Sequence, residues 1–382
     1  SGSNRSRSAS ELLLTQKTKL PCLTTVYSRQ SDICANDVFG IKIGISACLL
    51  GEKVRYDGSH KHDRYITDTL GRYFDWVPVC PEVGCGLPVP REAMRLVGDP
   101  EDPRLLTIRT GIDHTVRMKG WAQKKLDDLA KEDLSGFIFK SRSPSSGMQG
   151  VKVYSESGMP GRRGTGIFAK AFMERFPLLP VEDDGRLNDP GLRENFIERI
   201  FVFKRWQEFL KKGGSPRGLV DLHTGHKLLV MAHSPQHATK LGRYVAGSKE
   251  YGGRLNDLYI KTMMEGLRLI ATSRKNTNVL SHIMGYFKKQ LTVDEKQELL
   301  EIIDNYRKGL LPLIVPITIL NHYVRKYDEP YLKRQYYLNP HPLESFPGKE
   351  TPDHADHPGR GRPAARHGAA AAPRHPHRHA GP

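Results

Sequence analysis

The sequence predicts an α/β N-terminal domain with a mostly parallel sheet, followed by an all-α C-terminal domain. Three observations support this fold class. The chain has 382 residues, which is too long for one ordinary hydrophobic core and suits two domains. Up to about residue 180, apolar β-branched runs alternate with helical patterns, and strands that alternate with helices form parallel sheets. Beyond that point, helical patterns continue alone.

Three short apolar runs are predicted as strands, at residues 41–46, 76–79 and 136–139. They are followed closely by Cys48, Cys80 and Lys140. In open α/β sheets, ligands bind beyond the carboxyl ends of the strands, where the connecting loops meet. We therefore expect these three loops to form one site. The stretches between and after the strands predict helices, for example at residues 116–131 and 164–176.

The second half of the chain reads as helical. Apolar residues at spacings of three and four predict an amphipathic helix over residues 195–212, namely Phe196, Ile200, Phe203, Trp206 and Leu210. Further helices are expected at residues 219–232, after Ser234 with Pro235 at the first position, at 255–272 and at 293–308. The run 310–320 contains Pro312 and Pro316, which predict a kinked or broken element.

These patterns divide the chain into five segments. We predict a disordered segment at residues 1–40, the α/β domain at 41–182, a helical connector at 183–215, the helical domain at 216–346 and a disordered tail at 347–382. The tail is rich in Ala, Pro, Arg, Gly and His, and it has too few large apolar residues to form a core.

Composition and charge indicate a soluble, basic protein. No apolar run approaches the roughly 20 residues of a membrane-spanning helix, so we expect no membrane partner. The net charge of +17 includes +2 from residues 1–40 and +3 from residues 347–382, which leaves +12 on the body. This excess attracts phosphates or an anionic substrate, although a solvated basic surface explains it equally well.

The five cysteines are an odd number in a chain without the apolar core of a secretory signal near its start. They are Cys22, Cys34, Cys48, Cys80 and Cys85. This pattern favours reduced thiols that serve as ligands or nucleophiles, and a cytoplasmic location.

The loop from Cys80 to Gly86 carries the strongest local signal, because it holds two thiols and the carboxylate of Glu82. Soft thiolates select zinc, copper(I) or iron-sulfur clusters. A structural zinc site normally needs four ligands in paired short spacings, and no Cys-x-x-Cys pair occurs. Three thiols, those of Cys48, Cys80 and Cys85, are available in the folded part. A four-iron cluster on three thiolates leaves one iron open for catalysis.

Two other loops accompany this signal. Ser46 to Gly51 places Cys48 after the first strand, where the alternative role is a small buried apolar residue. Arg55, Tyr56 and Asp57 follow, either as substrate contacts or as a plain turn before a glycine. The hydroxyl-rich basic loop 140–147 offers amides and hydroxyls to an anion or a heterocycle, and its alternative is an ordinary Ser/Pro loop.

Residues 41 to about 180 resemble the thiouracil desulfidase (TudS) family. The resemblance is carried by Ser46-Ala-Cys-Leu-Leu-Gly51, Arg55-Tyr-Asp-Gly58, Cys80-Pro-Glu82, Pro90-Arg91 and Lys140 to Gly147. It implies an α/β fold and a 4Fe-4S cluster on three cysteines. It also implies an open iron that captures the sulfur of a thiolated pyrimidine and releases it as hydrosulfide.

One position departs from the family pattern. Where the family has Ser-Pro-Ser-Cys-Gly, this chain has Ser143-Pro-Ser-Ser146-Gly147. We therefore predict Cys48, Cys80 and Cys85 as the cluster ligands, with Cys85 replacing the missing one. Glu82 is predicted to move protons and Ser143 to orient the substrate or donate a hydrogen bond. The predicted substrate contacts are Arg55, Tyr56, Asp57, Arg91 and Ser146.

Residues 219 to about 340 resemble the YbgA-like domain, through Asp221 to Lys227 and Leu229 to Pro235. The resemblance implies no activity. His223 and His226 at spacing i, i+3, and His233 and His237 at i, i+4, suit a metal. Capping or core roles are favoured, because no carboxylate or cysteine motif lies nearby.

The leading functional hypothesis is an iron-sulfur desulfidase that acts on a small thiolated nucleobase. The alternative is a non-catalytic nucleic-acid or partner-binding protein with a structural metal site, although Lys and Arg do not cluster with aromatic residues as in base-stacking surfaces. A zinc-dependent hydrolase is a third possibility.

Overall fold

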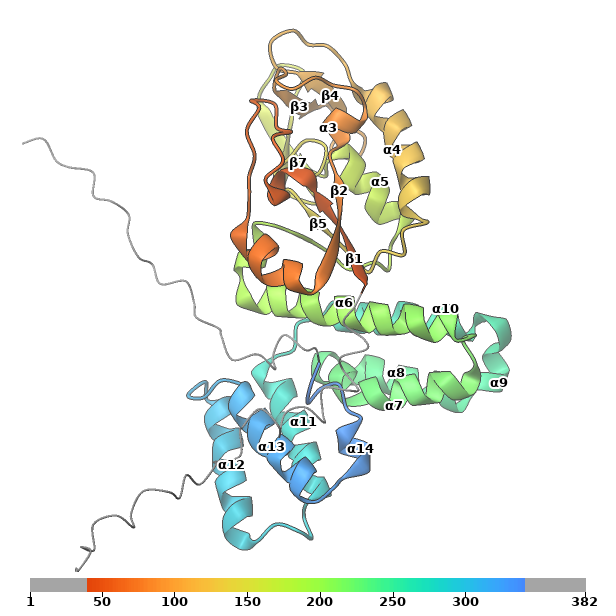
Figure 1. Cartoon of the computed structure of the whole chain (residues 1–382), viewed down its shortest axis with the longest axis vertical. Coiled ribbons are helices and arrows are strands. Elements are labelled where there is room, and N and C mark those ends of the chain that lie inside the picture. Colours follow the sequence, from red (N-terminus) through yellow and green to blue (C-terminus); the bar gives the residue numbers. More distant parts are fainter. Residues whose placement is uncertain (1–39, 341–382) are drawn as a thin grey trace, which may run out of the picture. The chain divides into compact units, whose positions relative to one another are not determined.

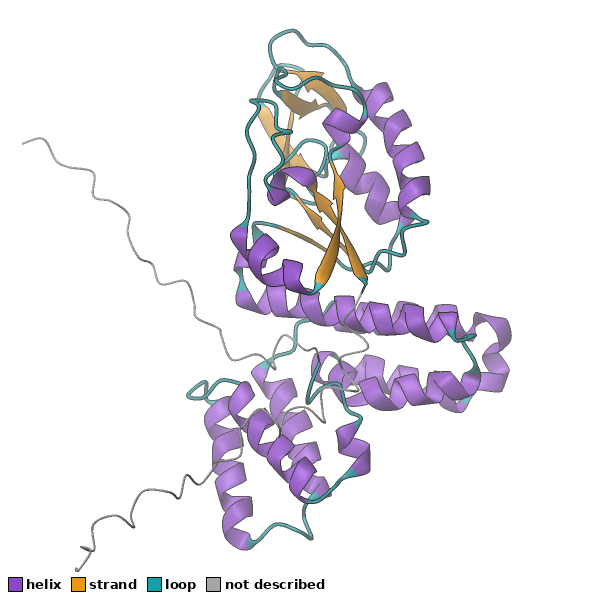
Figure 2. Ribbon diagram, in the orientation of Figure 1, coloured by secondary structure: helices purple, strands orange, loops and turns teal. Residues whose placement is uncertain are grey.

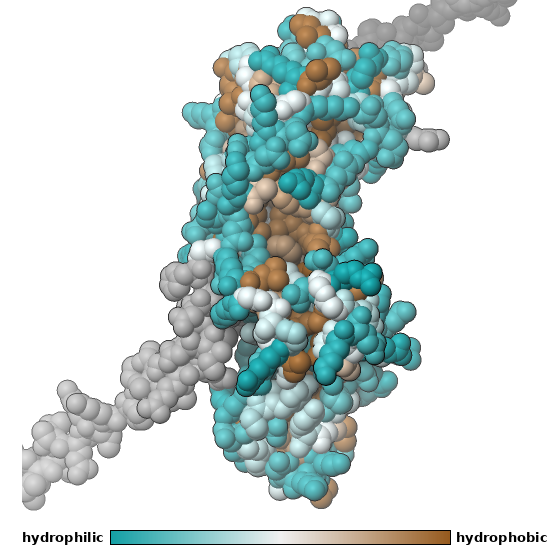
Figure 3. Space-filling view, turned by 90° about the vertical axis from the view of Figure 1, so that its right-hand side faces the viewer, coloured by the Kyte–Doolittle hydropathy of each residue, from teal (hydrophilic) through white to brown (hydrophobic). Residues whose placement is uncertain are grey.

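The structure, a computed structural model, describes residues 40–340 (Figure 1). The segments predicted to be disordered, apart from residue 40, lie outside this range, together with Cys22 and Cys34. Within residues 40–340, no helix combines the length and the apolar character needed to cross a membrane. The face drawn in Figure 3 is largely hydrophilic, with apolar side chains gathered in a few patches.

The N-terminal half contains the predicted parallel sheet (Figure 2). Its strands are β1 (Ile41–Ser46), β2 (Phe74–Val79), β5 (Gly136–Phe139) and β8 (Val181–Asp183), in the order β2-β1-β5-β8. All three neighbouring pairs are parallel. The α/β fold class with a mostly parallel sheet is therefore confirmed.

A second sheet, which the sequence did not predict, has four short strands. They are β3 (Met94–Val97), β4 (Arg104–Thr107), β6 (Val151–Tyr154) and β7 (Pro160–Gly164), in the order β4-β3-β6-β7. The outer pairs are antiparallel and the central pair is parallel. This sheet carries Met94, which lines a pocket together with the loops that follow β1, β2 and β5.

Helices cover both faces of the parallel sheet. Alternation along β5 sends Phe137 and Phe139 to the face of α4 (Thr115–Leu129) and α5 (Ile167–Arg175), and Ile138 to the face of α6 (Pro190–Lys211). Gly44 in β1 makes room for this packing, since a Cβ there would lie 2.2 Å from the Phe137 ring. The helix predicted at residues 195–212 is thus confirmed as α6, with an earlier start.

The C-terminal part of the described chain is all helical, as predicted. Its helices are α7 (Pro216–His233), α8 (Pro235–Ala246), α9 (Ser248–Tyr251), α10 (Leu255–Leu267), α11 (Ser273–Tyr286), α12 (Val293–Arg307), α13 (Ile314–Lys326) and α14 (Pro330–Lys333). The Ser234 side chain accepts from the His237 amide and caps α8. The run 310–320 is broken as predicted, because residues 310–313 lie outside α13, but Pro316 does not cause the break. This proline lies in the first turn of α13, where a missing N–H removes no helical hydrogen bond.

Short helical turns connect these elements. They are η1 (Ala47–Leu50), η2 (Tyr65–Thr69), η3 (Leu70–Arg72), α3 (Pro81–Gly84), η4 (Arg186–Asn188) and η5 (Gly252–Arg254). Two of them, η1 and α3, follow β1 and β2 directly and shape the site.

Candidate functional site

The parallel strands deliver three loops to one edge of the sheet. Ser46 at the end of β1 is in register with Val79 at the end of β2, and Ile45 is in register with Ile138 of β5. The chain then turns into η1, which carries Cys48, and into α3, which is preceded by Cys80. The three loops therefore meet where the sequence predicted a site.

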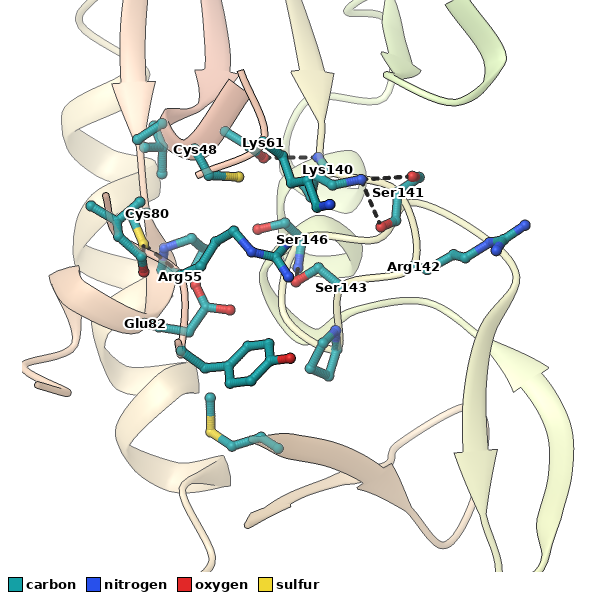
Figure 4. Close-up of a pocket in the computed structure, with 18 of the residues that line it drawn as sticks. Cys48, Arg55, Lys61, Cys80, Glu82, Lys140, Ser141, Arg142, Ser143 and Ser146 are labelled. Atoms are coloured by element: carbon teal, nitrogen blue, oxygen red, sulfur yellow. Dashed lines mark hydrogen bonds between the residues drawn. The ribbon is translucent and has the colours of Figure 1, made fainter. Parts of the chain in front are cut away.

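A pocket of about 350 Å³ lies between these loops (Figure 4). It is lined by Ser46, Ala47, Cys48, Val54, Arg55, Tyr56, Lys61, Val79, Cys80, Pro81, Glu82, Arg91, Ala93, Met94, Lys140, Ser141, Arg142, Ser143, Pro144 and Ser146. Eight of the ten predicted site residues are in this lining, namely Cys48, Arg55, Tyr56, Cys80, Glu82, Arg91, Ser143 and Ser146. Asp57 and Cys85 are not in it.

Asp57 takes part in a turn at the surface. Its carboxylate accepts hydrogen bonds from the backbone amide of Ser59, at 3.1 Å, and from the Ser59 hydroxyl, at 2.6 Å. The hydroxyl hydrogen bond is the main cause that lowers the pKa of Asp57. These contacts favour the plain-turn alternative, and a substrate contact by Asp57 stays a prediction.

Cys85 faces an apolar cluster outside the pocket. Its thiol is buried with Leu96 and Met118, and it donates to the Glu82 carbonyl oxygen at 3.2 Å. Among the described residues, no group of three or more His, Cys, Asp or Glu side chains is placed to hold a metal ion. Cys85 as third cluster ligand therefore has no support from its position and stays a prediction.

Replacement of Cys85 decides this point. From its position we expect Cys85→Ser to leave the iron and acid-labile sulfide content per chain unchanged. The sequence hypothesis expects the opposite, a complete loss of the cluster. The measurement is metal and sulfide analysis after purification without oxygen, with Cys48→Ser as the matched variant inside the pocket. A full cluster in the native chain that is lost in Cys85→Ser would restore the sequence hypothesis.

The two thiols that line the pocket are held in their protonated form. Burial raises the pKa of Cys48 to about 11, although Lys140 and Arg55 oppose it, and raises the pKa of Cys80 to about 12. The Cys80 thiol lies 3.5 Å from a carboxylate oxygen of Glu82. Neither side chain is a free thiolate near neutral pH, so nucleophilic attack by either thiol is disfavoured.

Alkylation of Cys48 tests its protonation. With a pKa of about 11 instead of 9.0, the thiolate fraction at pH 8 falls about 100-fold. We expect the reaction of Cys48 with iodoacetamide to be slower by at least this factor than in the urea-unfolded chain, and to accelerate up to about pH 11. Peptide mass spectrometry follows the modified residue. A rate that levels off near pH 9 would contradict the raised pKa.

Glu82 is the only carboxylate in the lining, and it is held in place by neighbours. The Ser145 hydroxyl donates to its Oε1 at 2.5 Å, and Arg91 Nη2 lies 4.0 Å from its Oε2. Arg91 itself donates to the carbonyl oxygen of Val54 at 3.0 Å. The carboxylate is thus fixed beside the two thiols, as a proton-transfer group requires.

Cations that the sequence did not single out as site residues also line the pocket, and they are Lys61, Lys140 and Arg142 (Figure 4). Lys140 Nζ binds Asp184 Oδ2 at 2.7 Å and the Ser141 hydroxyl at 2.9 Å. The Lys140 backbone amide donates to Ser46 Oγ at 2.9 Å, which ties β5 to β1. Together with Arg55 and Arg91, these side chains make the pocket a favourable place for a negatively charged sulfur.

The serine loop supplies a hydroxyl where the family resemblance implies a thiol. Ser143 Oγ accepts the Ser146 amide at 3.1 Å and the Ser145 amide at 3.3 Å, so it fixes a tight turn. Ser146 is only 4% exposed and lines the pocket with Cys48 and Cys80. The donor set in the lining is therefore two thiols and one hydroxyl. A cluster held by three thiolates does not fit this set, because the third donor is a hydroxyl.

The four histidines of the helical region that have metal-like spacings make structural contacts. His226 Nδ1 donates to the Leu222 carbonyl at 2.8 Å, and burial lowers the pKa of His226 to about 3. His233 contacts Glu198 at 3.1 Å, and His237 contacts the Ser234 hydroxyl. His223 contacts the Tyr259 hydroxyl at 3.1 Å. These contacts support the core and capping roles.

An α/β module with thiols, a carboxylate and cations at one edge of a parallel sheet is the class that the fold and site define. The family model described as 2-thiouracil desulfurase matches residues 43–184, which include the whole pocket. A family described as a protein of unknown function, DUF1722, matches residues 227–342. The chain is thus a fusion of a desulfurase-family module and a YbgA-like domain, as predicted.

The chain is similar to two further proteins. The uncharacterized protein YbgA of Escherichia coli (strain K12) is 36% identical over 149 residues, which are 38% of this chain and 87% of YbgA. The chain therefore belongs to the YbgA family. Among solved structures, the [4Fe-4S]-dependent thiouracil desulfidase TudS is 30% identical, with 39% of this chain and 93% of TudS covered and a TM-score of 0.31. The family assignment rests on the sequence matches.

Proposed function

We propose that the pocket removes the sulfur of a small thiolated nucleobase, such as a thiopyrimidine, by hydrolysis. The observation that carries this proposal is the convergence of Cys48, Cys80, Glu82 and several cations on one pocket of a desulfurase-family module. A volume of about 350 Å³ suits a single heterocycle, since small-ligand pockets start near 300 Å³. The reduced thiols of the described residues support the proposed cytoplasmic location.

In the proposed reaction, water attacks the carbon that carries the sulfur. Glu82 takes one proton from this water, and its position is set by Ser145 and Arg91. The carbon–oxygen bond forms and the carbon–sulfur bond breaks, so the sulfur leaves as hydrosulfide. Of the two protons of the water, one stays on the sulfur and the other passes to the solvent. No electrons are exchanged with an external donor, so the overall change is thiocarbonyl plus water to carbonyl plus hydrogen sulfide.

Other side chains of the pocket hold the substrate and the developing charge. Lys140 and Arg55 lie near Cys48 and stabilise negative charge on the departing sulfur. Arg91 Nε is buried and makes no hydrogen bond within the described residues, so it can donate a hydrogen bond to the heterocyclic ring of the substrate. Tyr56 is 44% exposed and offers an aromatic face, while Ser143 and Ser146 offer polar contacts.

The 4Fe-4S cluster is the part of the sequence hypothesis that the donor set supports least. The resemblance implies three thiolates, and the lining supplies those of Cys48 and Cys80. A hydroxyl is a harder ligand than a thiolate, so Ser146 is a poor replacement for iron-sulfur binding. The proposed hydrolysis uses only side chains of the pocket and water. Iron and sulfide content per chain, measured without oxygen, decides whether the protein takes one up.

Hydrosulfide release tests the proposal directly. The full chain, prepared without oxygen, is incubated with 2-thiouracil and with 4-thiouracil, before and after treatment with iron and sulfide. We expect hydrosulfide and uracil in equal amounts from one of the two substrates. If neither substrate yields hydrosulfide under either condition, the proposed function is wrong.

A further inference from the structure

A second cavity, of about 470 Å³, shares no residue with the pocket of the proposed function. Parts of α5, β8 and α6 and the segment after α10 line it. Its walls are mostly apolar and include Met148, Met173, Phe176, Leu179, Leu192 and Ile270. Such a cavity is large enough for a small organic ligand.

A buried arginine that forms no close ion pair lines this cavity. Arg199 is 8% exposed, and its Nε makes no hydrogen bond within the described residues. No ion pair within 4.0 Å involves Arg199 in the described part of the chain, and its guanidinium lies 5.9 Å from the Phe196 ring centre. Burial lowers the pKa of Arg199 to about 10, which still leaves it charged at neutral pH.

The nearby carboxylates are already engaged. Glu182 binds Arg186 Nε at 2.6 Å, and Glu198 contacts His233 at 3.1 Å. Arg268 also lines the cavity, where it donates to the Pro177 carbonyl, and its charge acts on Arg199. Three arginines thus face one carboxylate of the lining, that of Glu182. The charge of Glu182 acts on Arg199, but one carboxylate does not balance three guanidinium groups, so the site favours an anion.

We propose that this cavity binds a small organic carboxylate with an apolar body. The carboxylate pairs with Arg199 and Arg268, because a guanidinium fork matches the two oxygens of a carboxylate. The apolar body packs against Met148, Phe176 and Leu179. This site is independent of the desulfidase proposal, so either can fail without the other.

Calorimetric titration of the full chain with octanoate tests this site. We expect octanoate to bind and Arg199→Met to weaken this binding at least about tenfold. Octanol, which has the same chain without the charge, should bind the native protein at least about tenfold more weakly than octanoate. The matched control is Arg193→Met on the same helix, since Arg193 packs on the Tyr65 ring and is not part of the cavity lining.

Thermal unfolding shows whether Arg199→Met folds. Because Met removes a buried unpaired charge and keeps an apolar stem, its melting temperature should equal or exceed that of the native chain. The proposal is overturned if octanoate does not bind the native chain, or if Arg199→Met binds octanoate as tightly as the native chain does. It is also overturned if Arg193→Met weakens octanoate binding as much as Arg199→Met does. Octanol bound as tightly as octanoate would show an apolar cavity without an anion site, which also overturns it.

Discussion

Glu82→Gln is expected to lower the rate of hydrosulfide release from thiouracil by about 10²- to 10⁴-fold, the usual contribution of a general acid–base group. Glutamine keeps an oxygen that accepts the Ser145 hydrogen bond, which is 2.5 Å long in the native chain. The variant therefore removes the base and leaves the contact that positions it. We expect the loss in kcat, with little change in KM.

The matched control is Glu132→Gln. Glu132 pairs with Lys42 at 2.8 Å, close to the first residue of β1 and therefore at the opposite end of the strand from Cys48. Its replacement should leave the rate within about twofold, because an exposed ion pair contributes little to stability. If Glu82→Gln and Glu132→Gln release hydrosulfide equally fast, Glu82 does not move the proton.

Ser146→Cys is expected to raise the iron and acid-labile sulfide content from well below one cluster to about one cluster per chain. Ser146 is buried in the lining with Cys48 and Cys80, so a thiol there completes a set of three. The substitution exchanges one side-chain atom and keeps the Ser146 backbone amide on Ser143 Oγ. A broad visible absorption should appear together with the iron.

Ser135→Cys serves as the control for this gain. Ser135 is fully buried, but it lies directly before β5 and its hydroxyl donates to Gln207 Oε1 at 2.8 Å, away from the pocket lining. It should bind no more iron than the native chain. Equal iron in the native chain and in Ser146→Cys would mean that the hydroxyl, or another group, already completes the ligand set.

The strands and the two pocket thiols were predictable because they depend on local patterns. Alternating β-branched residues predicted residues 41–46, and parallel strands carry Cys48 and Cys80 to the same edge. The second sheet was missed because its strands have only four or five residues each, which is too short for a clear apolar pattern. Residues 160–164, for example, read Pro-Gly-Arg-Arg-Gly and pair only as an outer strand.

The direction in which the Cys85 side chain points could not be predicted from the number of residues between Cys80 and Cys85. The structure places the single turn α3 between them, and a helix rotates by about 100° per residue, so five residues end far from the starting direction. Lys140 was hard to assign for another reason. A lysine in a loop usually points to water, and only the fold brings Asp184 to hold it at the pocket.

The position of a bound substrate analogue tests the proposed function most directly. Crystals of Glu82→Gln, which is expected to bind without turnover, are soaked with 2-selenouracil, and the anomalous signal of selenium is measured. We predict a single selenium peak bordered by Cys48, Cys80 and Ser146. A peak outside this pocket, or none at a saturating concentration, would contradict it.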